Sequence, residues 1–198
     1  MEDLLLLSTA YLPPVEYFYL ILTHESFLIE GEENYQKQTY RNRCRILTSQ
    51  GPLYLSIPVL RASFHKVKTR DTEIDYSKKW QQIHLRSISS AYRSAPYFQY
   101  YFEIFEKIIS EGHKYLIDLN ASLLEALMGI IGIERKVLFT RSFTPRSNTD
   151  WRYDISPKKK SDYNARKYPQ VFDQFGFVPN LSIIDLIFNT GPDATEYI

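Results

Sequence analysis

The sequence predicts a single α/β domain whose mixed sheet is opened by a strand, a turn, a helix and a second strand. Short apolar runs at residues 4–7 and 27–29 flank a helical stretch, and residues 40–59 alternate in polarity like a β-hairpin. Several later stretches repeat apolar residues with helical spacing. The 198 residues are 44% hydrophobic and 24% charged, which is enough apolar material for one buried core. We therefore expect one domain over residues 1–198.

The opening unit lies within residues 4–29. Leu4–Leu7 has the short apolar pattern of a buried strand, and Pro13–Pro14 suits the start of a helix, where proline loses no hydrogen bond. Residues 15–22 are apolar nearly all round, which indicates a buried helix, and residues 27–29 indicate the second strand. Parallel α/β sheets bind ligands at the carboxyl ends of their strands, so the turn at Tyr11 is a candidate wall of a site.

A β-hairpin is expected next. Residues 40–47 alternate strictly and place three arginines on one face of a strand. Residues 53–59 return with their apolar side chains facing one way, after a turn that contains Gly51 and Pro52. The three arginines are Arg41, Arg43 and Arg45.

Helical spacing dominates the remainder of the chain. The expected helices span residues 76–95, 97–110, 118–131 and 181–188. Pro96 ends the first helix, and Gly132 ends the third. By their positions near helix starts, Asp118, Asn120 and Asn180 are expected to be caps, and Asp185 is expected at the surface.

Residues 137–139 suggest a short strand, and residues 141–168 then lack any periodicity, which predicts a long loop. Lysines and arginines alternate with aromatic residues in this loop. Such a composition suits a clamp for phosphate with a stacked base or sugar, but it also suits a solvated segment over the core, which is the favoured interpretation.

Charge is unevenly distributed although the net charge is only +1. Residues 1–35 carry seven acidic residues and no Lys or Arg, whereas residues 36–100 carry twelve basic and three acidic residues. A basic middle on one face would concentrate phosphates or carboxylates; alternatively, the acidic first part packs against it and neutralises it. The near-neutral total argues against a polycation that binds nucleic acid.

Most familiar catalytic patterns are absent. The seven glycines form no GxGxxG or Walker A motif, no Ser nucleophile elbow occurs, and the four histidines have no metal-binding spacing among themselves or with Cys44. We therefore expect no metal site, and the sequence identifies no cofactor. A lone cysteine and an acidic start predict a cytoplasmic protein, and no apolar run approaches the roughly 18 residues of a membrane span.

Residues 37–45 are the strongest candidate site. Side chains two apart on a strand lie about 6.6 Å apart on one face. Arg41, Arg43 and Arg45 can therefore present three guanidinium groups to one multiply charged anion, such as a diphosphate. The alternative is an edge strand that uses charge to prevent aggregation.

His84 and Cys44 are candidates for chemistry. His84 lies one turn after Trp80 on an apolar helix face, so it is either a satisfied core histidine or a proton-transfer or phosphate-contacting group. Cys44 points away from the arginines and is more typical of a small buried hydrophobe than of a nucleophile.

Several motifs, in order, resemble the WbqC-like proteins of bacterial surface-polysaccharide gene clusters. They are Tyr11-Leu12-Pro13, residues 40–46 (YRNRCRI), Gly51-Pro52 with residues 55–59, Trp80 with His84, Tyr92 with residues 95–98, Asp118-Leu119-Asn120, and residues 177–182 (FVPNLS). The resemblance implies a transferase of O-antigen or capsule assembly that acts on a nucleotide-activated sugar or another phosphorylated precursor. Transfer of an amino acid such as glycine to a sugar is one suggested reaction. The resemblance also favours a binding-site role for the row of Arg41, Arg43 and Arg45 over a role in protecting a strand edge.

The site implied in this way draws on most of these motifs. The substrate-binding candidates are Tyr11, Lys37, Arg41, Asn42, Arg43, Arg45 and Trp80, with His84 as the proton-transfer group and Asp118, Asn120 and Asn180 as secondary candidates. Within the site, Arg41 and Arg43 bind the anion, while the Tyr11 turn and Trp80 shape the pocket.

The chain departs from the family pattern at several positions. Ser8–Ala10 stands where the family has Gln-Pro, Glu16 where it has Gly, and Cys44 where it commonly has Asn, and the region between Thr140 and Tyr168 is shorter. A contribution of that glutamine to the site is therefore absent from this chain.

Two other functions remain open: a non-catalytic anion-binding or assembly protein of the same pathway, and an adenylyltransferase-like enzyme, although no HxGH motif occurs.

Overall fold

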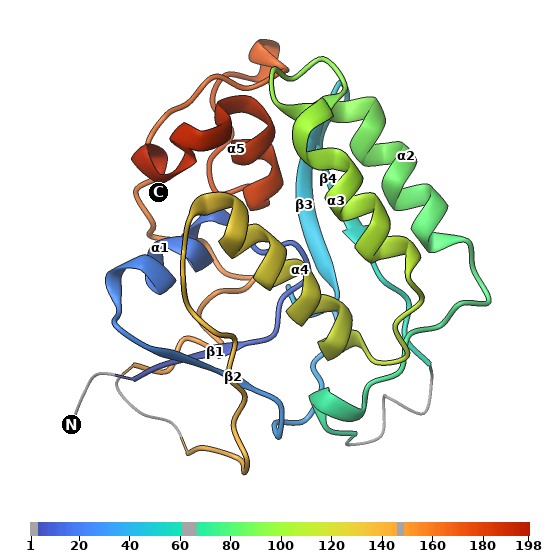
Figure 1. The fold of residues 1–198 in the computed structure, drawn as a ribbon, viewed down its shortest axis with the longest axis vertical. Coiled ribbons are helices and arrows are strands. Elements are labelled where there is room, and N and C mark those ends of the chain that lie inside the picture. The colour runs from blue at the N-terminus through green and yellow to red at the C-terminus, as the bar shows by residue number, and fades with distance from the viewer. Residues whose placement is uncertain (1–3, 61–66, 146–148) are drawn as a thin grey trace.

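The computed structural model describes residues 4–60, 67–145 and 149–198 and confirms the α/β architecture (Figure 1). The strands form two separate two-stranded sheets rather than one mixed sheet. Residues 1–3, part of the basis for the cytoplasmic expectation, and residues 146–148 of the expected loop lie outside the described residues. No helix in the described part of the chain is long and apolar enough to cross a membrane.

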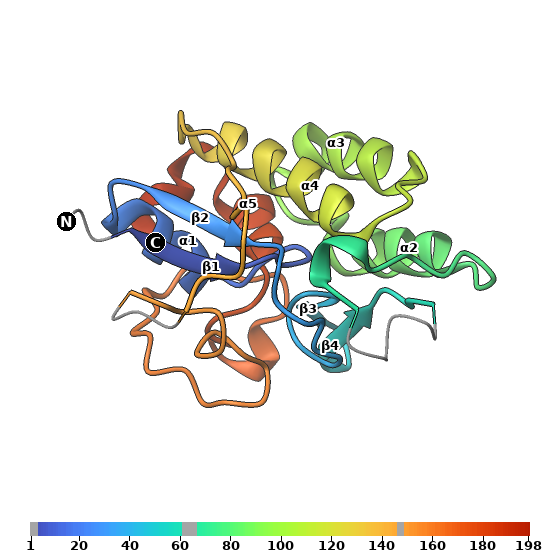
Figure 2. The ribbon, with the colours of Figure 1, turned by 90° about the horizontal axis from the view of Figure 1, so that it is seen from below.

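The opening unit is confirmed. Strand β1 (Leu5–Ser8), helix α1 (Val15–Thr23) and strand β2 (Phe27–Glu30) follow one another, and the two strands pair in parallel. Single bridges extend this sheet at both edges, with Phe139 beside β2 and Asp150 beside β1. The strand expected at residues 137–139 is thus reduced to one bridge. The sheet lies between helix α4 (Leu116–Ile131) and the segment of residues 150–170 (Figure 2).

The hairpin consists of β3 (Arg43–Thr48) and β4 (Gly51–Ser56), paired antiparallel. Its first strand begins at Arg43 and not at Tyr40, because residues 40–42 form a turn that distant groups hold. The amide of Tyr11 donates to the Tyr40 carbonyl (2.8 Å), and the side-chain amide of Asn120 donates to the Arg41 carbonyl (2.8 Å). Arg41 therefore lies outside the strand that carries Arg43 and Arg45.

Of the five α-helices in the described part of the chain, four follow the hairpin. They are α2 (Trp80–Tyr92), α3 (Phe98–Ser110), α4 and α5 (Ile183–Thr190), with 3-10 turns η2 (Thr69–Asp71), η3 (Asp173–Phe175) and η4 (Gly191–Tyr197). Helix α2 starts at Trp80 rather than Tyr76, and Gly132 ends α4 in the left-handed conformation, as expected. Helix α2 packs between α3 and the hairpin (Figure 2), which buries Trp80, His84 and Ile88 on one face.

Three expected caps and one expected surface residue have other positions. Asn180 does not cap α5, whose N-cap is Ser182; instead its Oδ1 accepts a hydrogen bond from the Glu16 amide (3.1 Å) in the first turn of α1. Asn120 is buried inside α4, and Asp118 lies in that helix's first turn after the N-cap Tyr115. Asp185 is fully buried and accepts a hydrogen bond from the Tyr168 hydroxyl (2.7 Å). Its burial raises the pKa of the Asp185 carboxyl.

Candidate functional site

A cavity of about 690 Å³ opens between the hairpin and α2. We call it the hairpin cavity; residues 35–43, residues 53–59 and the first turns of α2 with the preceding turn supply its lining. Its volume lies within the range of about 300–1,000 Å³ that is typical of small-molecule sites. The sequence-predicted site residues that line it are Lys37, Asn42, Arg43, Trp80 and His84.

The lining of the hairpin cavity carries an excess of positive charge. Lys37, Arg43 and Lys78 face a single acid, Asp75, whose pKa is lowered by hydrogen bonds from Ser77. Arg43 forms no ion pair with any described residue, and its guanidinium carbon lies 5.7 Å from the centroid of the Tyr54 ring. A half-buried guanidinium without a carboxylate partner favours an anionic ligand.

Four buried polar atoms around this cavity have no hydrogen-bond partner among the residues that the structure describes. They are the Tyr35 hydroxyl, Asn42 Oδ1, Arg43 Nε and Trp80 Nε1, and all four residues line the cavity. A buried polar group without a partner costs stability, so such groups are usually satisfied by protein, water or a ligand. Their concentration here, on two separate segments of the chain, supports a site that a polar ligand completes.

His84 lines the cavity and contacts Tyr11, which lies behind it in the core. The Tyr11 hydroxyl lies 2.9 Å from His84 Nδ1, and the Trp80 ring meets the imidazole edge-on with ring centroids 5.2 Å apart. Burial lowers the pKa of His84 to about 4, although a hydrogen bond with the Ser56 main chain opposes this shift. Burial raises the pKa of the Tyr11 phenol, so both groups are neutral at pH 7. Tyr11 is fully buried and reaches the cavity only through His84.

The expected row of three arginines does not form. Arg41 is buried and paired with Glu33, whose Oε1 lies 2.6 Å from Nη2 and 2.8 Å from Nε. This pair is a case of the acidic first part of the chain neutralising the basic middle. Arg45 shares the face of β3 with Arg43 but does not line the hairpin cavity. Of the three arginines, only Arg43 lines this cavity.

A second buried charge cluster lies at the carboxyl ends of β1 and β2, and sequence reasoning missed it. Arg152 binds both carboxylate oxygens of Asp150 (2.9 and 2.7 Å) and Glu30 Oε2 (2.8 Å). The carbonyl of Arg152 also accepts a hydrogen bond from Arg41 Nη2 (3.4 Å), which connects the cluster to the turn before Arg43. The one signal in the sequence was Glu30, an acid directly after a buried apolar strand.

The remaining candidates lie away from the hairpin cavity. Asp118 is exposed and lines a smaller cavity of about 290 Å³, and Asn180 binds Glu16. Asn120 holds Thr9 and the Arg41 carbonyl through its side-chain amide (3.1 and 2.8 Å), so it fixes the turn that precedes Arg43. Cys44 is fully buried, and burial raises the pKa of its thiol, which disfavours a nucleophilic role. Within the described ranges, no group of three His, Cys, Asp or Glu side chains is arranged to hold a metal ion.

Two motif segments that are distant in the sequence meet each other and strand β3. The turn at residues 12–14 pairs with residues 181–183 through the Val15 amide to the Leu181 carbonyl (3.0 Å) and the Ile183 amide to the Pro13 carbonyl (2.8 Å). The Ser182 hydroxyl donates to the Leu12 carbonyl (2.8 Å), where Leu12 has a positive φ of 42°. The Ser182 amide then donates to the Arg45 carbonyl (2.8 Å), which links both segments to β3.

Comparison with known proteins identifies the family. The chain is 29% identical over 238 aligned positions to an uncharacterised protein, Rv1507c, of Mycobacterium tuberculosis, and the alignment covers 100% of this chain and 98% of that protein. No solved structure matches the chain significantly. The WbqC-like protein family matches residues 9–163 and 159–197, which include the motifs that contribute to the lining of the hairpin cavity, at residues 40–46, 55–59 and 80–84. The chain therefore belongs to the WbqC-like protein family.

Proposed function

We propose that the hairpin cavity binds a phosphorylated small molecule, such as a nucleotide-activated sugar, and that the protein transfers a group from it in bacterial surface-polysaccharide biosynthesis. Family membership supports the pathway. The observation that carries the ligand class is Arg43, a guanidinium without an ion-pair partner among the described residues, in a cavity where cations outnumber acids. A guanidinium fork matches two phosphate oxygens at once, which gives both strength and orientation.

The other lining residues take roles that follow from their positions. Lys37 adds a second positive charge, and Trp80 with Tyr54 supplies aromatic surface for the uncharged part of the ligand. Asn42 fixes the start of β3, because its side-chain amide and its carbonyl both bind the main chain of Ile57 (2.8 and 2.7 Å). His84 is the proton-transfer group of the proposal. It is neutral at pH 7 and can accept a proton from a ligand by exchanging one of its hydrogen bonds, to the Tyr11 hydroxyl or to the Ser56 main chain.

Replacing Arg43 with alanine is the direct test. The variant should bind a nucleotide sugar at least tenfold more weakly, because a hydrogen bond to a charged group contributes about 1.5–3 kcal/mol. Isothermal titration calorimetry with UDP-glucose and with sodium pyrophosphate measures this loss. Arg45→Ala, which changes the neighbouring arginine outside the cavity, should lose much less affinity.

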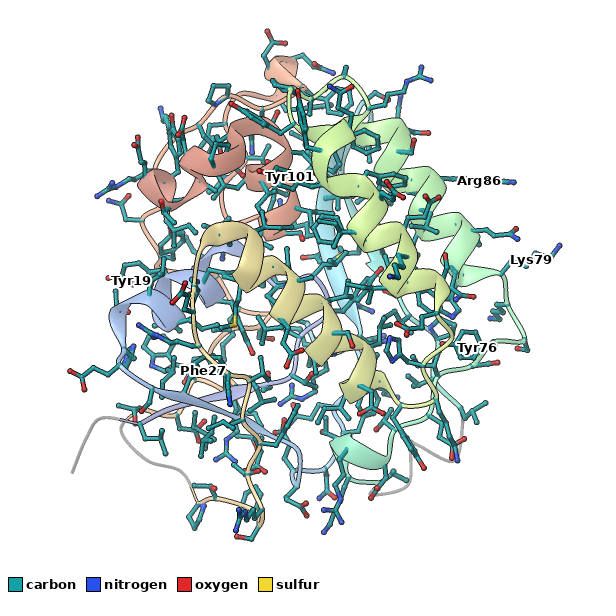
Figure 3. The ribbon with its side chains drawn as sticks, viewed as in Figure 1. Tyr19, Phe27, Tyr76, Lys79, Arg86 and Tyr101 are labelled. Carbon is teal, nitrogen blue, oxygen red and sulfur yellow. The ribbon has the colours of Figure 1, made fainter. Side chains whose placement is uncertain are left out.

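Arg86→Ala is the matched control, because Arg86 projects from the solvent-facing side of α2 (Figure 3). Its affinity for both anions should equal that of the parent protein. Equal affinities of the Arg43→Ala variant and the parent would end the assignment of this cavity to anions.

One observation favours a second candidate, a non-catalytic binding protein of the same pathway. His84 is 3% exposed, its pKa is about 4, and its ring already binds the Tyr11 hydroxyl and the Ser56 main chain, which is typical of a structural histidine. The two functions differ in turnover. Binding of an activated sugar that depends on Arg43, without release of a nucleotide in the presence of any acceptor, would identify the binding protein.

A further inference from the structure

A second large cavity, of about 710 Å³, lies beside helix α1. We call it the α1 cavity; Glu16, Tyr19 and Leu20 of α1 form one wall, and Trp151, Asp154, residues 159–164, Arg166 and Ile198 form the others. The lining includes basic and aromatic residues of the loop at 141–168, whose composition suits a ligand clamp although a solvated segment was the favoured interpretation: Trp151, Lys159, Lys160, Tyr163 and Arg166. Tyr19 extends from α1 at the periphery of the molecule (Figure 3).

Hydrogen bonds tie the loop side of this cavity to its surroundings. The Ser161 hydroxyl donates to Glu16 Oε2 (2.9 Å), and the Tyr163 hydroxyl donates to the Ile198 carbonyl (3.1 Å). Arg166 donates to the Glu196 carbonyl (2.7 Å). The stretch expected to be a solvated loop therefore forms a wall with defined contacts on both α1 and the last residues of the chain.

The charges of this lining balance, in contrast to those of the hairpin cavity. Three basic side chains and three acidic side chains line it: Lys159, Lys160, Arg166, Glu16, Asp154 and Asp162. Several of them already have partners, since Lys159 pairs with Asp154 (2.6 Å) and Glu16 accepts hydrogen bonds from Ser161 and Asn180. A balanced and largely satisfied set of charges does not favour an ionic ligand.

The polar side chains of the lining that have no partner among the described residues suit a ligand with many hydroxyl groups. Lys160, Asp162 and Asn164 form no hydrogen bond or ion pair within the described residues, and together they offer donors and acceptors. Tyr19, Tyr163 and Trp151 add aromatic surface. The Tyr19 and Tyr163 rings contact each other with centroids 5.3 Å apart and planes inclined by 43°, so no planar base fits between them. A pyranose ring, with an apolar C–H face and a polar rim, matches this combination.

We propose that the α1 cavity is a binding site for an uncharged saccharide, separate from the anion site in the hairpin cavity. The assignment stands on the lining of this cavity and does not rest on the proposed function. A small cavity lined by Tyr35, Gln36, Lys37 and Lys158 adjoins the hairpin cavity, because the two share Tyr35 and Lys37.

The two tryptophans of the chain make the test specific, because Trp151 lines the α1 cavity and Trp80 lines the hairpin cavity. The W80F variant keeps Trp151 as its only tryptophan, and W151F keeps Trp80. Each is titrated with glucose, N-acetylglucosamine and their β-linked disaccharides, with adenosine, and with sodium pyrophosphate. We expect saturable changes in Trp151 emission with at least one saccharide, and no response of Trp80 to the saccharides.

Saturation-transfer NMR on the unmodified protein gives a second readout that needs no tryptophan variant. The saccharide C–H protons should receive saturation from the parent protein. Tyr19→Ala should weaken saccharide binding at least tenfold, whereas Tyr100→Ala, which changes a tyrosine that is 64% exposed on α3, should leave it unchanged. Pyrophosphate binding that depends on Arg43 reports on the other cavity, so failure of one assignment is distinguishable from failure of the other.

Three results would overturn the saccharide assignment. They are the absence of saturable binding by any of these saccharides at millimolar concentrations, a Trp151 response to adenosine or pyrophosphate alone, and equal saccharide affinity of the Tyr19→Ala variant and the parent.

Discussion

Replacing Arg152 with methionine is expected to lower the free energy of unfolding by about 3–5 kcal/mol, the usual cost of breaking a buried ion pair from one side. The Arg152 side chain is 1% exposed and binds the buried carboxylates of Glu30 and Asp150. Methionine fills only part of the space of the arginine side chain and leaves both buried carboxylates without the Arg152 cation. Urea unfolding followed by circular dichroism measures the loss.

Two further variants separate charge from packing. Arg86→Met changes an exposed arginine on α2 and should alter the unfolding free energy by no more than about 0.5 kcal/mol. Combining Arg152→Met with Glu30→Gln and Asp150→Asn should restore part of the lost stability, since no unpaired charge remains buried. A loss below about 1 kcal/mol in the single variant would contradict a stabilising role for the cluster.

Acidification from pH 6.5 to pH 4 is expected to cost the parent protein about 3 kcal/mol of stability through His84. The pKa of His84 is about 4 in the folded protein and about 6.5 in an unfolded chain. Between these values the unfolded state binds more protons than the folded state, so stability is fully present above pH 6.5 and falls as the pH decreases. Unfolding free energies measured at pH 7, 6, 5 and 4 give the slope.

The variant His84→Asn should lack this component of the slope, whatever its absolute stability. His113→Asn changes a partly exposed histidine that pairs with Glu111 at the surface, and this control should keep the parental slope. Parallel pH profiles for the parent and the His84→Asn variant would contradict a buried, neutral histidine beside Tyr11.

The neutral state of His84 also bears on function, because a neutral imidazole can accept a proton but cannot donate one at pH 7. Any transfer reaction in the hairpin cavity must therefore take its acid from another source, such as the ligand or water. This constraint separates the proposed transferase from an enzyme that relies on an imidazolium acid.

Much of the fold followed from local pattern. The opening strand, helix and strand, the hairpin, and the face of α2 that buries Trp80 and His84 were predictable, because a period of two or of 3.6 residues determines which side chains share a face. Gly132 as the end of α4 is a local feature too, since it depends on one residue that tolerates a positive φ.

The site was only partly predictable, because local periodicity does not show which distant segments of the chain meet. Alternation placed Arg41 in a row with Arg43, but the turn at residues 40–42 is held by Tyr11 and Asn120, which no local pattern connects to it. Arg152 and Glu30 pair across 122 positions of sequence, and Asp185 is buried against Tyr168.

The sequence by itself determined the type and order of most elements, the positive charge of the middle segment and the likeness to the WbqC-like family. Only the tertiary structure decided which charged groups are neutralised and which line a cavity. The physical reason is that periodicity depends on neighbours a few residues apart, whereas the partner of a charge depends on which distant segment packs against it. Arg41 and Arg43 are two residues apart, yet one is buried against Glu33 and the other lines the hairpin cavity.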